Sequence, residues 1–236
     1  MVGVLLILCF LSNLAFGAAN LAFQDVYHAF FAYDGSTEHL IIRTVRLPRA
    51  LIATFVGAAL AVSGVIMQGI TRNPLASPSI LGVNAGASLA VVGTTFVFQG
   101  IELSLSVWFA FLGAAATAVG VYILGSLGYG GLTPINLTIA GAALTAFLTS
   151  LTSGILIISQ QTLDQIRFWL AGSLAGRDLE LFWQVFPYFS IGLLVALALG
   201  RQITMLSLGE DVAKGLGQRT VVIKLIAGIT VVLLAG

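Results

Sequence analysis

Four long stretches of the chain carry no charged side chain, and their lengths set the first constraint on the fold. The runs are Ala50–Thr71, Asn73–Ile101, 103–163 and Leu181–Gly200. A helix needs ~20 apolar residues to cross the ~30 Å hydrocarbon core, so the third run is long enough for two crossings. A membrane β-barrel would instead alternate apolar and polar residues over ~10-residue segments. The pattern therefore predicts an all-α, polytopic transmembrane helix bundle.

The same pattern predicts seven spans. They lie near residues 2–19, 50–70, 80–99, 105–127, 136–158 and 183–200, with a seventh from 221 onward. Met1–Ala18 also has the length of a signal peptide, but it lacks the basic start of one, so we favour a first span. Because the chain stops at Gly236 inside an apolar run, we expect residues 1–236 to be one transmembrane domain, truncated at its C-terminus.

Composition excludes several classes of protein. Hydrophobic residues make up 58% of the chain and charged residues 8%, against roughly 25% charged in soluble domains. With a net charge of +1 and no basic stripe, nothing favours nucleic acid as a partner. Cys9 is the only cysteine, and we expect it to be a small core residue. No metal or catalytic motif is present, and no phosphate-binding glycine loop, so we expect no catalytic residue, metal site or bound cofactor in this chain.

The polar stretch over residues 20–49 is predicted to be an external loop with one short amphipathic helix. Its two histidines, His28 and His39, are expected to be solvated rather than metal ligands. The Lys/Arg count of alternate loops is tied at five against five, so the usual orientation rule fails here. Small residues recur four apart at Gly82 and Gly86, and at Gly172 and Gly176, a spacing that lets helix backbones approach closely.

Three polar clusters carry the chemistry. The first contains Arg43, Arg46 and Arg49 at the entry to the second span, with Pro48 suited to a first helical turn. Arg46 and Arg49 are three apart and are predicted to share an outward face. They serve either as interfacial anchors or as a docking point for carboxylates of a partner protein.

The second cluster is Arg72–Pro78, where two prolines four apart end the second span. Asn84 then lies within an apolar run, either for an interhelical hydrogen bond or beside a water-filled pathway. The third cluster, Leu206–Gly217, is a short amphipathic helix closed by glycine. It contains few basic residues, which favours a soluble protein partner over anionic lipid. No acidic residue lies within a predicted span, so any driving energy is expected from another subunit.

Together these clusters resemble the permease subunits of the iron-siderophore, haem and cobalamin ABC importers, the FecCD or BtuC-like family. The resemblance runs nearly the whole chain in the expected order. The matching segments are Arg46–Arg49, Val56–Gly64, Gln68, Arg72–Pro78, Leu81–Gly86, Ile139–Leu144, Phe168–Ser173 and Leu206–Gly217.

The resemblance implies a type II importer permease of ten spans, of which about 6.5 are present here, in a bacterial inner membrane. Two permease subunits, identical or different, work with two cytoplasmic ATPase subunits, which bind the ATP and magnesium, and with an extracytoplasmic substrate-binding protein. It places Arg46 and Arg49 at the binding protein. The residues that it implies for the ATPase contact are Leu208, Gly209, Glu210, Ala213, Leu216 and Gly217. Those for the pathway are Met67, Gln68, Asn84, Thr145, Thr149 and Ser153, and those for a cytoplasmic gate are Leu132, Thr133 and Pro134.

The chain departs from the family pattern at both ends, because the basic N-terminal extension and the final three spans are missing. The residues of the motifs resemble those of siderophore and ferric citrate permeases more than those of cobalamin permeases, which favours an iron(III)–siderophore or ferric citrate cargo. Transport is expected to occur by alternating access. Haem and cobalamin importers remain alternatives. So do an ion-coupled carrier, which should show buried carboxylates, and a scaffold that only assembles with a partner.

Overall fold

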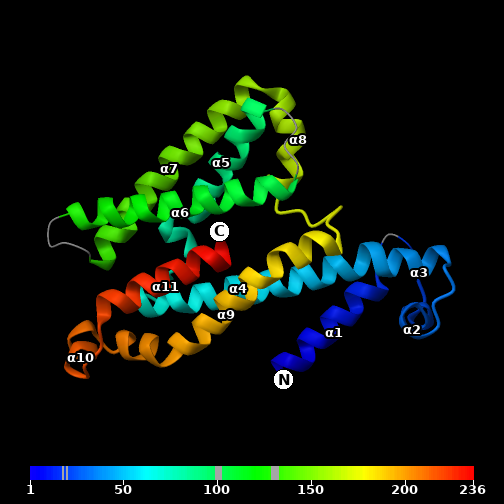
Figure 1. The fold of residues 1–236 in the computed structure, drawn as a ribbon, viewed down its shortest axis with the longest axis horizontal. Coiled ribbons are helices and arrows are strands. Elements are labelled where there is room, and N and C mark those ends of the chain that lie inside the picture. Colours follow the sequence, from blue (N-terminus) through cyan, green and yellow to red (C-terminus); the bar gives the residue numbers. More distant parts are fainter. Residues whose placement is uncertain (18, 20, 99–102, 129–132) are drawn as a thin grey trace. The chain divides into compact units, whose positions relative to one another are not determined.

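The computed structural model describes residues 1–17, 19, 21–98, 103–128 and 133–236, and all regular structure in these ranges is helical (Figure 1). The all-α prediction is therefore confirmed. In chain order the elements are α1 Val2–Ala15, α2 Phe23–Phe31, α3 Thr37–Ile41, the π-helical turn η1 Ile42–Arg46, α4 Leu47–Thr71, the 3-10 turn η2 Pro78–Leu81, α5 Val83–Phe98, α6 Leu103–Leu127, α7 Pro134–Ile158, α8 Gln160–Leu170, α9 Leu179–Ser207, α10 Glu210–Gly215 and α11 Thr220–Ala235.

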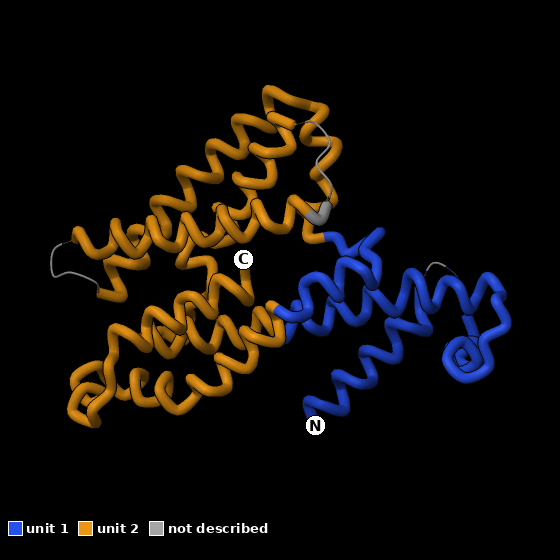
Figure 2. Tube along the Cα trace, in the orientation of Figure 1, with its two compact units in different colours: residues 1–58, 173–187 blue, residues 59–172, 188–236 orange. Residues whose placement is uncertain are grey.

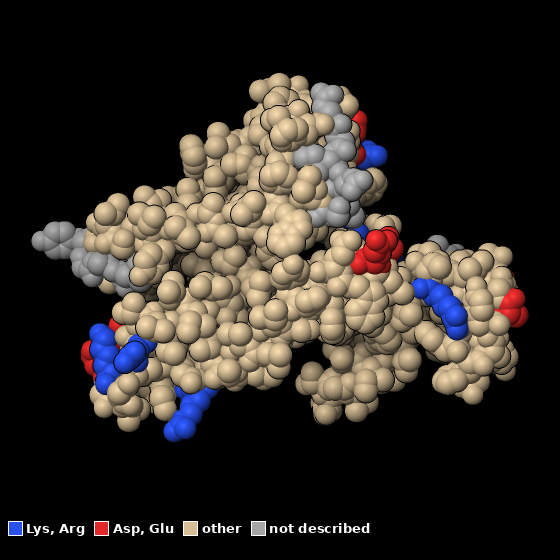
Figure 3. All heavy atoms as spheres, viewed as in Figure 1, with Lys and Arg blue, Asp and Glu red and all other residues tan. Residues whose placement is uncertain are grey.

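Four helices are long and apolar enough to cross a membrane. They are Thr37–Thr71, Leu105–Leu127, Pro134–Ile158 and Leu179–Ser207. Each contains one of the predicted spans, and the remaining three predicted spans are the shorter apolar helices α1, α5 and α11. On the face seen in Figure 3 the charged side chains are few and gather in separate groups, and most of the surface between them is uncharged.

The segment before α4 differs from the predicted loop. Besides α2, it contains α3 and η1, which run without a break into α4. Pro48 lies in the first turn of α4, as predicted, but no break separates that turn from η1. The backbone N–H of Leu47 donates to the carbonyl of Ile42, five residues back. Such a wide turn accommodates a proline, which has no N–H and would clash with the carbonyl four residues before it.

The chain forms two compact units, residues 1–58 with 173–187 and residues 59–172 with 188–236, so α4 and α9 contribute to both (Figure 2). Unit 1 contains α1, α2, α3 and η1. Its helical halves of α4 and α9 meet through aromatic rings, since the ring of Phe55 lies 5.3 Å from that of Phe182 and 5.4 Å from that of Phe186.

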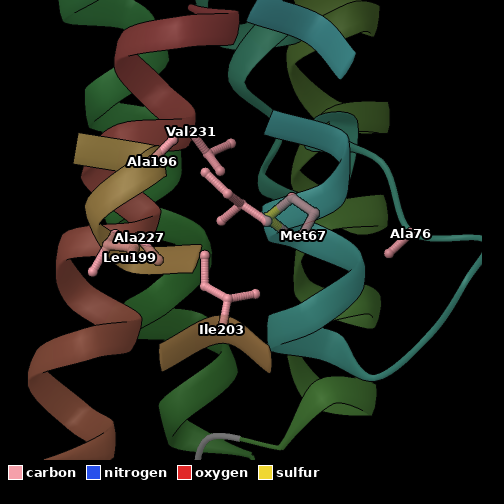
Figure 4. Close-up of a cluster of buried hydrophobic side chains, with 8 residues drawn as sticks. Met67, Ala76, Ala196, Leu199, Ile203, Ala227 and Val231 are labelled. Atoms are coloured by element: carbon pink, nitrogen blue, oxygen red, sulfur yellow. The ribbon is translucent and has the colours of Figure 1, made fainter. Parts of the chain in front are cut away.

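Unit 2 has two apolar cores. One joins α4, α9 and α11 around Met67, Leu199 and Val231 (Figure 4). The other joins α5 and α6 around Val83 and Ala114.

Glycines allow α5 and α6 to pack closely, because a Cβ at Gly86 would overlap the carbonyl oxygen of Gly113 and the side chain of Thr117. The small-residue prediction is thus confirmed at Gly86. It is wrong at Gly172 and Gly176, where the backbone is left-handed and no atom lies within 4 Å of a would-be Cβ. Those two glycines serve turns.

Cys9 is exposed, so its prediction as a core residue is wrong. The reason is that α1 exposes apolar side chains along nearly its whole length, and only Leu14 and Ala15 are buried. In a helix surrounded by lipid an apolar side chain needs no protein core, so hydrophobicity alone does not predict burial.

Candidate transport and docking sites

Arg46 closes the C-terminal end of α1. It is 7% exposed, and its Nη1 donates to the carbonyls of Leu14 (2.8 Å) and Ala15 (2.6 Å) while its Nη2 donates to that of Ala19 (2.5 Å). The last carbonyls of a helix have no intrahelical donor, and the helix dipole favours a cation there. The guanidinium supplies both the donors and the charge.

Arg43 holds α2 in the same way. Its Nε donates to the carbonyl of Ala29 at 2.6 Å, and its guanidinium lies over the ring of Tyr33, 4.2 Å from the centroid. Arg49, in contrast, is exposed. The expectation that Arg46 and Arg49 share an outward face is therefore wrong for Arg46, because three backbone carbonyls take up its donors. Docking to a binding protein stays a prediction, and Arg49 is the side chain placed for it.

His39 is 4% exposed, so its predicted solvation is wrong, whereas His28 is exposed as expected. The Nδ1 of His39 lies 2.7 Å from Oδ1 of Asp34. The backbone N–H of Ser36 donates to Asp34 at 2.9 Å, and this bond, with the Ser36 hydroxyl and His39, lowers the pKa of Asp34. Within the described residues no three His, Cys, Asp or Glu side chains converge as metal ligands would.

The proline-bounded connection after α4 is irregular, as the two prolines predict. Arg72 has a left-handed backbone, with φ of 53°, and Asn73 Oδ1 accepts the N–H of Leu75 at 2.9 Å. Leu75 is 89% exposed. Farther on, the carbonyl of Ile80 lies so close to Gly141 of α7 that a Cβ there would overlap it. The connection is therefore fixed to α7 at one end and exposed at the other.

The predicted pathway residues fall into three groups by exposure. Met67 is 2% exposed and belongs to the core cluster in Figure 4, so it does not line an open surface of this chain. Thr145 is half-buried, and its Oγ1 has no hydrogen-bond partner in the described part of the chain. The other four residues are exposed; they are Gln68, Asn84, Thr149 and Ser153.

Thr149 and Ser153 lie one helical turn apart on α7, and Thr145 one turn before them, as residues four apart do. Only 11% of the α7 window is buried within the chain, the lowest share among the four long helices. At the start of α7, Thr133 Oγ1 accepts the N–H of Asn136 at 3.2 Å and Pro134 takes the first position. Of the predicted gate, Leu132 lies outside the described residues.

The short helix α10 is attached to α11 through Glu210. Its Oε2 accepts from Nζ of Lys224 at 2.6 Å, and its Oε1 lies 3.2 Å from both Nζ of Lys214 and the hydroxyl of Thr220. The bond from Lys224 is the main cause that lowers the pKa of Glu210 to about 2. The amide of Gln218 donates to the carbonyl of Gln202 at 3.0 Å, which ties the same turn to α9.

Apolar side chains on α10 and at both of its ends are exposed. Val212 on the helix, Leu208 just before it and Leu216 at its C-cap are 49%, 68% and 62% exposed, while Ala213 is fully buried. Gly209 and Gly217 have φ values of 131° and 80° and bound the helix. We call the three exposed side chains the α10 apolar face.

The FecCD transport family model matches residues 5–236. Among curated relatives, the chain is 49% identical over 225 residues to the probable siderophore transport system permease protein YfiZ of Bacillus subtilis, which covers 95% of this chain and 68% of that protein. This chain belongs to the FecCD transport family.

Two further relatives and one solved structure agree with this assignment. The chain is 43% identical to the Fe(3+)-citrate import system permease protein YfmD of B. subtilis (95% of this chain, 66% of that protein) and 41% identical to the ferric enterobactin transport system permease protein FepD of Escherichia coli (99% and 70%). A structure of a transporter assigned to the metal-chelate ABC type, in an inward-facing conformation, matches with a TM-score of 0.82 at 30% identity, covering 99% of this chain and 72% of that one. The chain spans about two thirds of the length of these relatives.

Family membership makes the chain a transport subunit and a multi-pass membrane protein, as predicted from the sequence. Sequence reasoning missed the partners of Arg43, Arg46 and Glu210. One signal was available for Glu210: Lys224 is a lone cation near the start of an apolar run, and a charge in that position calls for a carboxylate.

Proposed function

We propose that the chain is the membrane-spanning permease of an ATP-driven importer for iron(III)–siderophore complexes in a bacterial inner membrane. The observation that carries the proposal is the α10 apolar face on a member of this transport family, with α10 attached to α11 through Glu210. The relatives' names, which mention siderophore, ferric citrate and ferric enterobactin, support the cargo class.

In this proposal α10 is the contact for a cytoplasmic ATPase subunit. A short helix with exposed apolar side chains on it and at both of its ends fits a hydrophobic groove of a partner. Lys224 and Thr220 lie at the start of α11, so a displacement of α10 is passed to α11 through Glu210, and to α9 through Gln218. The ATP and magnesium belong to the ATPase.

The cargo path is proposed to run along the exposed side of α7. Thr149 and Ser153 offer hydroxyl groups there without charge, which suits a large chelate that must bind weakly and leave. A second permease subunit, identical or different, completes the path. Arg49 is proposed to meet a carboxylate of the binding protein, since guanidinium groups pair well with carboxylates.

The α10 contact is tested with the double variant Leu208→Asp/Leu216→Asp, co-expressed with the proposed ATPase subunit. We expect the ATPase to be lost from the purified complex, because two carboxylates cannot enter an apolar groove. The control is Leu208→Met/Leu216→Met, which keeps the apolar volume. Retention of the ATPase by the Asp variant, with the membrane protein folded, would overturn the coupling role of α10.

A further inference from the structure

α2 presents an aromatic face that packing within unit 1 does not cover. Phe23, Tyr27 and Phe31 are four residues apart and 64%, 61% and 76% exposed. The rings of Tyr27 and Phe31 stack with centroids 4.7 Å apart. On the other side of the helix, Ala29 is fully buried. α2 is therefore amphipathic, with its large aromatic side chains on the exposed side.

The direction of this face is fixed by the contacts of α2. The helix packs on α3 and η1, and the Arg43 bond to the carbonyl of Ala29 locks its last turn to η1. The aromatic face thus has a set orientation relative to the long helix that continues into α4.

The position of η1 along that helix gives the depth of α2. The charge-free run Ala50–Thr71 holds 22 residues, about 33 Å of helix, which matches the ~30 Å hydrocarbon core. Arg46 and Ile42 lie four and eight residues before Ala50, hence about 6 and 12 Å beyond the hydrocarbon. The headgroup layer adds roughly 5–7 Å on each side. α2, packed on η1, therefore lies at the level of the headgroups or just beyond them.

The exposed apolar surface of α1 continues onto α2. α1 exposes side chains such as Val4, Leu5 and Leu8 at 55–62%. At its end Phe16, 69% exposed, meets Phe23 edge to face, with ring centroids 5.8 Å apart. The surface that α1 offers to lipid thus passes through Phe16 to the aromatic face of α2.

We propose that α2 is an interfacial helix whose aromatic face lies in the headgroup layer of the outer leaflet and fixes the depth of Arg49, one residue before Ala50, at the hydrocarbon edge of that layer. Aromatic side chains favour this layer, and α2 carries no Lys or Arg, so the binding needs no anionic lipid. Gln24 and His28, exposed beside the aromatic face, lie on the water side. The choice of the outer leaflet rests on the proposed function, which puts Arg49 on the side of the binding protein, whereas the position of the aromatic face in a headgroup layer does not.

Site-directed spin labelling tests this position. Cys9 is the only cysteine, so a Cys9→Ser background accepts one label at Tyr27→Cys, Phe31→Cys or the control His28→Cys. The protein is placed in phosphatidylcholine nanodiscs, and collisions of each label with oxygen and with a water-soluble nickel chelate are compared. At Tyr27 and Phe31 we expect the collision rate with oxygen to exceed that with the chelate several-fold, and at His28 we expect the collision rate with the chelate to be higher.

Two results would overturn the proposal. Dominance of the chelate at Tyr27 and Phe31 would place the face in water. An immobile label shielded from both reagents would mean that protein covers it. Where a cysteine lowers the yield of folded protein, Tyr27→Trp is used instead. The fluorescence that the new tryptophan adds to that of the parent must then be quenched by brominated lipid.

Discussion

The arginine segment of unit 1 and the α10 region of unit 2 were both predicted to be docking sites, but they use their charges in the same internal way. Arg46 binds three carbonyls at the end of α1, and Glu210 binds Lys224 and Thr220. What differs is the group left exposed, which is the cation Arg49 in unit 1 and the apolar face of Leu208, Val212 and Leu216 in unit 2.

This difference separates the kinds of partner that the two regions fit. An exposed guanidinium gives orientation and salt-dependent association, whereas an apolar face gives tight, salt-insensitive contact. A binding protein that must arrive and leave suits the first, and an ATPase that remains bound suits the second. Arg46 and Glu210 hold their regions in shape, and the proposed contacts are formed by the groups left exposed beside them.

Arg46→Ala should have the largest effect. It leaves three carbonyls at the end of α1 without their charged donor, at a cost of about 3 kcal/mol. We expect a marked fall in the yield of folded protein and in its midpoint of thermal unfolding. Arg49→Ala, the matched control, should change stability by about 0.5 kcal/mol or less. Equal effects of the two variants on stability would contradict the assignment of a structural role to Arg46 and not to Arg49.

Glu210→Gln should uncouple transport without releasing the ATPase. The amide cannot hold Lys224 as an ion pair, so motion of α10 no longer reaches α11, while the α10 apolar face is unchanged. We expect ATP-driven uptake to fall about tenfold, or about 1.4 kcal/mol, with normal co-purification. The charge exchange Glu210→Lys/Lys224→Glu should restore part of the uptake, and Asp211→Asn, an exposed neighbour, should have no effect. Loss of the ATPase from the Glu210→Gln complex would instead make Glu210 a direct contact.

Arg49→Glu should weaken the binding of the substrate-binding protein several-fold, with a loss that shrinks as salt is added, because rim charges act through screened attraction. Titration of the labelled binding protein against the permease in nanodiscs measures this change. Stability and ATPase binding should stay as in the parent. An unchanged affinity at low salt would contradict the proposed contact between Arg49 and a carboxylate of the binding protein.

The smallest effect concerns pH. The folded pKa of Glu210 is about 2, below the value of ~4.3 for an unfolded glutamate. Its contribution to stability is therefore fully present above about pH 4.5 and is lost as the pH falls toward 2. The difference in thermal midpoint between the parent and Glu210→Gln should stay constant from about pH 8 to 5 and shrink below that. A difference that already shrinks near pH 6 would show that the ion pair does not hold Glu210 charged.

The long helices could be predicted because charge-free runs of spanning length leave few alternatives in lipid. Residue environments could not. Cys9 and Met67 are both apolar, yet one is exposed and the other is in a core, and only helix packing decides which. The wide turn before Pro48 also needed the structure, because a proline fits either a first turn or a π-helical bulge.

The location of the candidate site could be predicted from the sequence, but the hydrogen bonds within it could not. The spacing of Leu208 and Leu216 indicated an amphipathic helix, and the structure exposes both. In contrast, the carbonyls that Arg46 binds come from residues 27 to 32 positions earlier, a separation that no local pattern reports.

The central claim is that this permease moves its cargo only when a separate ATPase hydrolyses nucleotide. The direct measurement is uptake of a radioactive iron(III)–siderophore complex into vesicles that contain the permease, with its binding protein outside and ATPase subunits with ATP inside. We predict uptake that requires all three and stops with a non-hydrolysable nucleotide. Uptake driven by an ion gradient in vesicles without ATPase and nucleotide would contradict the account.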